Sequence, residues 1–121
     1  MSGATYQAID PSVLMAAAGD GASFKMLSQT FLDHAVPIAR QLRQALADGQ
    51  HAAIGRHSHA LKGMAGLIGA AALIAQLQQL ETAARLLQPM PVSATDAWMP
   101  CFEQVCGEVA LSLDDPAYGG A

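Results

Sequence analysis

Apolar residues recur every three or four positions along most of the chain, which is the spacing of one face of a helix. Strands would need β-branched or aromatic runs bounded by turn signals, and such runs are scarce here. The pattern therefore predicts five helices. A short one begins at Pro11, behind Asp10 as N-cap, and stops near Gly19. Longer ones follow at about 22–47, 50–69 and 71–87, and from about 93–96 to 113.

Three of the long helices carry an apolar stripe that predicts their buried face. The stripe of the 71–87 helix has coiled-coil-like spacing, and core packing is its expected role, ahead of a helix-mediated dimer. Pro37 lies inside the 22–47 pattern and predicts a kink or a break there. The stripes consist of Phe24, Leu27, Phe31, Ile38, Leu42 and Leu46; of Leu73, Leu77, Leu80, Ala84 and Leu87; and of Trp98, Phe102, Val105, Val109 and Leu113.

Four substantial helices joined by short connections favour an all-α fold. We expect an antiparallel up-down four-helix bundle, with the short N-terminal helix capping one end. Residues 1–113 make a single domain in this interpretation, and the Gly-rich segment 114–121 is expected to be a flexible tail.

Composition narrows the classes of function. The chain has 121 residues and a net charge of -4 with only six Lys and Arg, so it offers no basic stripe for nucleic acid. No apolar run reaches the about 20 residues of a membrane span, and the N-terminus lacks the basic and apolar regions of a signal peptide. A cytoplasmic protein without membrane insertion is expected. Cys101 and Cys106 are interpreted as reduced core thiols, because no CxxC or Cys/His zinc spacing is present.

The helix expected at 50–69 separates an apolar face from a face built around one histidine. With about 100° per residue and His59 at zero, one group lies within about 40° of the opposite pole, which faces the core. That group is Ile54, His57, Leu61, Met64 and Ile68. On the His59 side lie Gly55, Gly63 and Gly66, flanked by Arg56 and Lys62. His59 is therefore predicted to be exposed, among bare backbone and positive charge.

The glycines of this face are a candidate functional feature. Glycine inside a helix costs about 0.5–1 kcal/mol relative to alanine, so stability alone does not select Gly55, Gly63 or Gly66 on a solvent face. Without side chains there, another protein can approach the imidazole closely. Imidazole offers a nucleophilic nitrogen at neutral pH, and Lys62, one turn away, can contact a phosphoryl group that carries about two negative charges.

The same residues resemble the signature of the histidine phosphotransfer (HPt) domains. In that family the phosphorylated histidine is followed by Lys at +3, Gly at +4 and often Gly at +10; here these are Lys62, Gly63 and Gly69. The resemblance extends from about residue 6 to residue 87, and the last helix matches only as a generic bundle member. Glu81 and Arg85 match positions that often border the family's histidine, and their spacing allows an ion pair between them.

The resemblance implies a four-helix bundle that carries a phosphoryl group on His59. The group would come from a receiver-domain aspartate or a histidine kinase and pass to a response-regulator aspartate. Mg²⁺ would be supplied by the receiver domain, so this chain would need no cofactor or metal and would have no autonomous turnover. Partner contacts are expected at Gly55, Arg56, Gly66, Glu81 and Arg85, and the protein is expected to be a monomer.

Other interpretations of the pattern stay open. The same chemistry occurs in the phosphotransfer module of a chemotaxis-type kinase, and a degenerate bundle could dock onto a receiver or kinase without carrying phosphate. A haem- or metal-binding bundle would need ligands that converge from facing helices. His57 points away from His59, so core or boundary packing is its expected role, while His34 and His51 are interpreted as surface residues.

Overall fold

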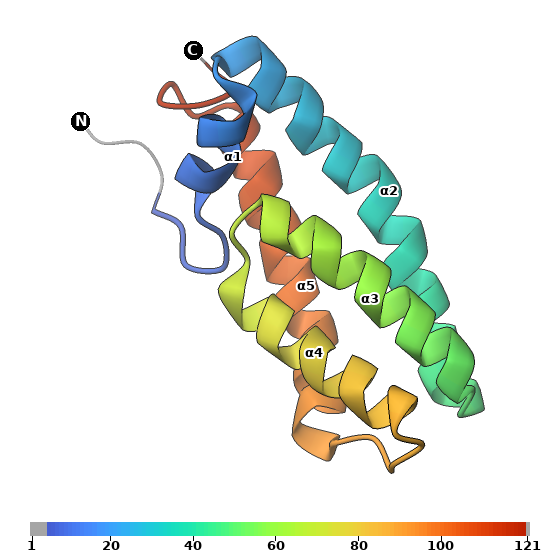
Figure 1. The fold of residues 1–121 in the computed structure, drawn as a ribbon. Coiled ribbons are helices and arrows are strands. Elements are labelled where there is room, and N and C mark those ends of the chain that lie inside the picture. The colour runs from blue at the N-terminus through green and yellow to red at the C-terminus, as the bar shows by residue number, and fades with distance from the viewer. Residues whose placement is uncertain (1–4, 121) are drawn as a thin grey trace.

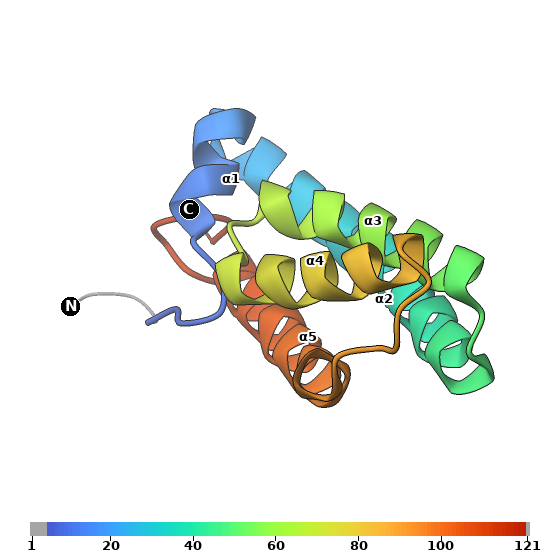
Figure 2. The ribbon, with the colours of Figure 1, turned by 60° about the horizontal axis from the view of Figure 1, so that its bottom comes forward.

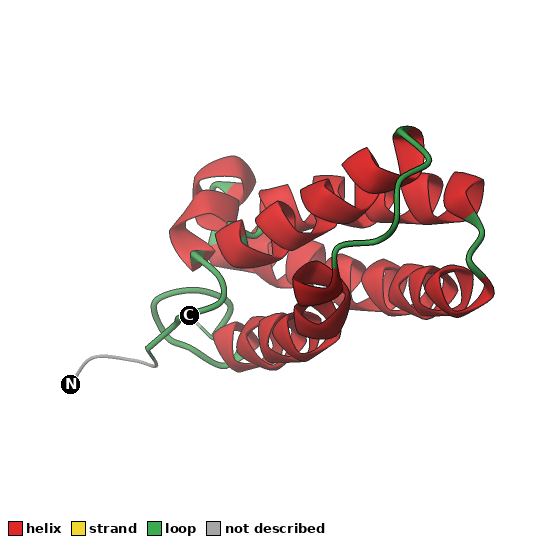
Figure 3. Cartoon of the chain, turned by 90° about the horizontal axis from the view of Figure 1, so that it is seen from below, coloured by secondary structure: helices red, strands yellow, loops and turns green. Residues whose placement is uncertain are grey.

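Over residues 5–120, which the computed structural model describes, the chain forms five helices and no strand (Figure 1). The helices are α1 (Pro11–Ala18), α2 (Gly21–Asp48), α3 (His51–Leu67), α4 (Ala71–Arg85) and α5 (Val92–Leu113). Figure 3 shows them joined only by loops and turns. The all-helical fold predicted from the hydrophobic pattern is confirmed for this part of the chain, with helix ends that differ by a few residues at most.

The four long helices contact one another in a ring. α2 packs on α3, α3 on α4, α4 on α5 and α5 on α2, while the short α1 packs on α2. Figure 2 shows α3 and α4 side by side along one side of the molecule. Exposed side chains of α3 and α4 are therefore close enough to contact one another on the outer surface of this helix pair.

The helix ends follow the local signals in the sequence. Asp10 caps α1 by accepting a hydrogen bond from the Ser12 backbone N–H, as predicted, and Asp20 caps α2 in the same way through Ser23. α2 continues as a single helix through Pro37, which is exposed, so the alternative of a complete break is not observed.

The core contains most of the predicted apolar stripes. The fully inward members are Phe24, Phe31, Leu42, Leu73, Leu77, Leu80, Ala84, Trp98, Phe102, Val105 and Val109, whereas Leu27, Ile38, Leu46 and Leu113 are only partly buried. Leu87 was expected in the α4 stripe but is 75% exposed, because α4 ends two residues before it. Cys101 and Cys106 are free thiols packed at the edge of the core rather than inside it.

Residues 114–120, expected to belong to a flexible tail, fold back onto the bundle instead, and Ala121 lies outside the described residues. Tyr118 stacks on Phe24 with ring centroids 5.3 Å apart, and the buried Asp115 accepts a hydrogen bond of 2.7 Å from the Tyr6 hydroxyl. Composition suggested flexibility, but one aromatic ring and one buried carboxylate supply contacts that hold the segment.

The hydroxyl of Tyr6 should contribute measurably to stability. A hydrogen bond to a charged group is worth about 1.5–3 kcal/mol, so Tyr6→Phe should lower the free energy of unfolding by about 1.5–3 kcal/mol in denaturant titrations. Tyr118→Phe is the matched control, because no described residue accepts a hydrogen bond from its hydroxyl. An equal loss in both variants would contradict this interpretation.

The Tyr6 contribution should also depend on pH. Burial, and then the hydrogen bond to Asp115, raise the pKa of Tyr6 far above its usual range. A folded-state pKa above the unfolded value of about 10 means that the stabilisation is complete below pH 10 and is lost as the pH rises beyond it. Unfolding curves of wild type and Tyr6→Phe should therefore differ at neutral pH and converge at strongly alkaline pH.

Candidate functional site

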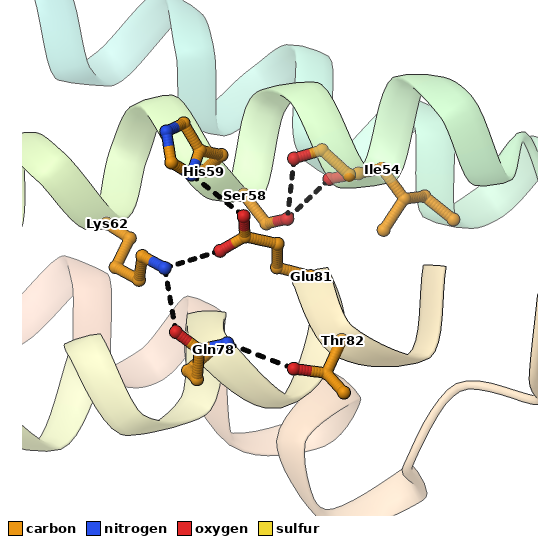
Figure 4. A network of polar contacts seen from close by, with 8 residues as sticks. Ile54, Ser58, His59, Lys62, Gln78, Glu81 and Thr82 are labelled. Carbon is orange, nitrogen blue, oxygen red and sulfur yellow. Dashed lines mark hydrogen bonds and ion pairs between the residues drawn. The ribbon is translucent and has the colours of Figure 1, made fainter. Parts of the chain in front are cut away.

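His59 stands on the outer surface of α3, and its side chain is 70% exposed. Its Nδ1 atom lies 2.8 Å from Oε2 of Glu81 on α4 (Figure 4). The other ring nitrogen, Nε2, has no hydrogen-bond partner among residues 5–120. The ring is thus held at one nitrogen and open at the other.

Glu81 joins His59 to Lys62. Its second oxygen, Oε1, accepts a hydrogen bond of 2.5 Å from Nζ of Lys62, which also donates to Oε1 of Gln78 at 2.7 Å. Gln78 in turn donates through Nε2 to Oγ1 of Thr82, at 2.9 Å, as Figure 4 shows. One carboxylate on α4 therefore orients the histidine and the lysine of α3 together.

The charge of Glu81 determines which histidine nitrogen carries a proton. Burial raises the pKa of Glu81, but the hydrogen bonds from Lys62 and His59 and the charges of these two groups together lower it more, so its pKa lies below the usual range. An ionised carboxylate can only accept hydrogen bonds, so Nδ1 of His59 must be the donor. In the neutral imidazole this leaves the lone pair on Nε2.

The inner side of α3 keeps the helix in place below His59. Ile54, Leu61 and Ile68 are buried as predicted, and Ser58 is buried with its hydroxyl donating 2.6 Å to the Ile54 carbonyl oxygen. His57 is half-buried at the boundary, where burial, and then the charge of Arg56, lower its pKa. One side of α3 thus packs against the core, and the opposite side exposes His59.

Packing within this chain does not explain all of the glycines near His59 in the same way. A Cβ at Gly63 or Gly66 would meet nothing within 4 Å, and one at Gly55 would make an ordinary contact of 3.7 Å with Ala84. Gly69 differs, because its φ is +66° and a Cβ there would lie 2.9 Å from Cβ of Asp10. Gly69 is therefore required by the fold, whereas Gly63 and Gly66 leave open surface.

A groove of about 410 Å³ runs beside His59 between α3 and α4. Arg56 and Arg85 line it from the two helices, and neither forms an ion pair with a residue in the described part of the chain. The pair that the sequence allowed between Glu81 and Arg85 is not formed, because Glu81 faces α3 instead. The groove is lined by His51, Ala52, Gly55, Arg56, His59, Glu81, Ala84 and Arg85.

Comparison with known proteins agrees with this site. The family model of the Hpt domain matches residues 26–113, which is most of the chain. The protein belongs to the Hpt family. The crystal structure of histidine-containing phosphotransfer protein B (HptB) from Pseudomonas aeruginosa PAO1 is similar, with a TM-score of 0.74 and 25% sequence identity over 88% of this chain and 94% of that one. A search among curated proteins finds no match.

The site residues expected for an Hpt domain fall into two groups in the structure. His59, Lys62 and Glu81 are connected by hydrogen bonds, while Arg56 and Arg85 line the groove without joining that network. Gly55 lines the groove too, whereas Gly63 and Gly66 lie beyond it along α3. His34 is exposed, as expected, but His51 is half-buried, with Nε2 3.2 Å from the Gln88 carbonyl oxygen.

Sequence reasoning missed Gln78, the second partner of Lys62. Its position three residues before Glu81 places it on the same face of α4, so the signal was present once Glu81 was singled out. Among residues 5–120, no group of three or more His, Cys, Asp or Glu side chains is arranged to hold a metal ion. In the same range, no helix has the length and apolarity to cross a membrane.

Proposed function

We propose that His59 accepts a phosphoryl group at Nε2 from a receiver-domain aspartate or a histidine kinase, and passes it to a response-regulator aspartate. The observation that carries this proposal is the 2.8 Å contact between Nδ1 of His59 and the Glu81 carboxylate. With the proton held at Nδ1, the free lone pair belongs to Nε2, which is the nitrogen that an incoming protein can reach.

The transfer makes one bond and breaks one bond. The Nε2 lone pair attacks phosphorus, the N–P bond forms, and the P–O bond to the aspartyl carboxylate breaks, so the leaving electrons return to that carboxylate. The reverse step hands the phosphoryl group to the next aspartate. Mg²⁺ on the receiver would stabilise most of the developing charge, so this chain needs no cofactor and acts as a carrier without autonomous turnover.

Lys62 and Gly63 support the reaction in different ways. The Lys62 ammonium group is bound to Glu81 and Gln78 when His59 is unmodified, and it can turn to a phosphoryl group that brings about two negative charges. Gly63 leaves the surface beside His59 open for a partner. Partner contacts are proposed for Gly55, Arg56, Gly66, Glu81 and Arg85.

The proposed site lies on the packed helices of the bundle. We place α2 to α5 as an antiparallel up-down bundle with α1 at one end, which is supported by their closed ring of contacts and short connections. The protein would act as a monomer in the cytoplasm, and its partners would be the receiver domain of a response regulator and a sensor or hybrid histidine kinase.

The test is phosphoryl transfer from Mg²⁺-loaded, phosphorylated receiver domains to the wild-type protein. We expect a label on this chain that is lost in acid and retained in base, as a phosphoramidate bond on histidine requires. If a panel of receivers and kinases leaves the chain unlabelled while at least one of them binds it, the protein is a docking bundle and not a carrier.

Glu81 should act as a positioning residue for this reaction. Glu81→Gln keeps the size but offers an amide, which can donate as well as accept, so Nδ1 is no longer fixed as the donor. Loss of a charge-assisted hydrogen bond of about 1.5–3 kcal/mol corresponds to a roughly 10- to 100-fold slower transfer. ¹⁵N NMR of the imidazole should show His59 protonated at Nδ1 in wild type and a mixture of tautomers in the variant. A variant with the wild-type tautomer and rate would show that Glu81 does not position the ring.

A further inference from the structure

Three helices of this protein end in the same way, but one of them uses an unusual residue. In each, the two N–H groups after the last turn bond back to carbonyl oxygens five and three residues earlier, with a residue of positive φ between them. α2 places Gly49 at that position, with φ 63°, and α3 places Gly69, with φ 66°. α4 places Leu87, with φ 55°, the only residue other than glycine with positive φ in residues 5–120.

Nothing within the described chain compensates for Leu87. A side chain in the left-handed region is unfavourable, and glycine would avoid the cost. Burial of the side chain would offset this conformational cost, but Leu87 is 75% exposed and Leu86, beside it, is 55% exposed. The end of α4 therefore holds an apolar side chain in water at an unfavourable backbone conformation.

This position continues the groove beside His59. The Leu87 N–H bonds to the carbonyl oxygen of Ala84, and both Ala84 and Arg85 line the groove. The contact between His51 and the Gln88 carbonyl oxygen ties the segment after α4 to the start of α3, and Figure 2 shows these two helix ends together. Leu87 is thus held at the edge of a surface that begins at the reactive histidine.

The charges of the same surface have a definite sign. Lys62 is neutralised by Glu81, but Arg56 and Arg85 line the groove from α3 and α4, and neither forms an ion pair with a carboxylate of residues 5–120, although the chain as a whole carries a net charge of -4. Uncompensated cations around an apolar contact attract a surface of opposite charge. An acidic partner would be repelled by most of this protein and attracted here.

We infer that the end of α4 is the docking element for the receiver domain, with Leu87 as its apolar anchor and with Arg85 and Arg56 bound to carboxylates of the receiver. The inference rests on the proposed function, since the receiver is the partner that must reach His59. It assigns selectivity between receivers to Leu87, Arg85 and Arg56, and the chemistry to His59, Lys62 and Glu81.

The test separates docking from chemistry by using two phosphoryl donors. Phosphoramidate is a small donor that labels exposed histidines without docking. The second donor is a phosphorylated receiver, chosen as the one that labels the wild-type protein fastest, and transfer from it needs the docking interface. The variants are Leu87→Asn, which keeps a residue that tolerates the left-handed region, and Arg56→Gln combined with Arg85→Gln. The controls are Met26→Gln and the pair Arg40→Gln with Arg43→Gln, which remove an exposed apolar side chain and two exposed arginines on α2.

We expect both docking variants to lower kcat/KM for transfer from the receiver about tenfold and to label with phosphoramidate within about twofold of wild type. The arginine pair should also flatten the dependence of the transfer rate on salt, and Leu87→Asn should not lower the melting temperature. The inference is overturned if the docking variants match their controls, or if phosphoramidate labelling falls as much as receiver transfer. Failure of phosphoramidate and of every receiver to label wild type would instead overturn the proposed function.

Discussion

Replacing His59 by glutamine should abolish phosphoryl transfer while leaving the protein folded. Glutamine is similar in polarity but has no nucleophilic nitrogen, so transfer should fall by on the order of 10³-fold or more, to the detection limit. The side chain is 70% exposed and contributes no core packing, so the free energy of unfolding should change by less than about 1 kcal/mol. Transfer assays and denaturant titrations on the same preparations measure both quantities.

His57→Gln is the matched control for this substitution. His57 lies two residues away on α3 but at the opposite pole, half-buried in a hollow that residues of α2 also line. The His57→Gln variant should still accept phosphoryl groups on His59, at close to the wild-type rate. If the His59→Gln variant is still labelled and the His57→Gln variant is not, the phosphoryl group is carried by His57, which would contradict the assignment to His59.

The largest effect on stability is expected at Gly69. Its left-handed conformation costs an alanine about 1–2 kcal/mol, and the added Cβ would also lie 2.9 Å from Cβ and 3.0 Å from the carbonyl oxygen of Asp10. Backbone atoms cannot turn aside as a flexible side chain can, so overpacking adds about 1–3 kcal/mol. Gly69→Ala should therefore lower the free energy of unfolding by about 2–5 kcal/mol, measured by denaturant titration.

Gly49→Ala isolates the conformational part of that cost. Gly49 has a φ of 63°, almost the same as Gly69, but a Cβ there would meet nothing within 4 Å. It should lose only about 1–2 kcal/mol. If the two alanine variants are equally destabilised, the close approach between Gly69 and Asp10 does not matter to stability.

The elements and the exposed histidine could be predicted because they depend on local spacing. The period of apolar residues fixes helices, and the same period places His59 opposite Ile54 and Leu61 on α3 whatever the rest of the chain does. The end signals were also local, since Asp10 caps α1 as predicted, and α2 ends at Gly49, close to the predicted end of that helix at 47.

The missing parts of the prediction depend on how helices meet. The spacing allowed an ion pair between Glu81 and Arg85 on the same helix, but the packing of α3 against α4 brings Glu81 to His59 and Lys62 instead, and the spacing alone could not show this. The tail was expected to be flexible from its glycines, yet Tyr118 finds Phe24 across more than 90 residues of sequence. Leu87 fitted the heptad spacing, and only the backbone shows that α4 has already ended there.

The most direct test of the central claim is to locate the phosphoryl group on the protein by NMR. After transfer from a phosphorylated receiver, one ¹⁵N-labelled imidazole should show coupling to phosphorus at Nε2, with Nδ1 still protonated, and sequence assignment should place it at His59. A phosphoryl group at Nδ1, or on any other histidine, would contradict the roles assigned here to Glu81 and His59.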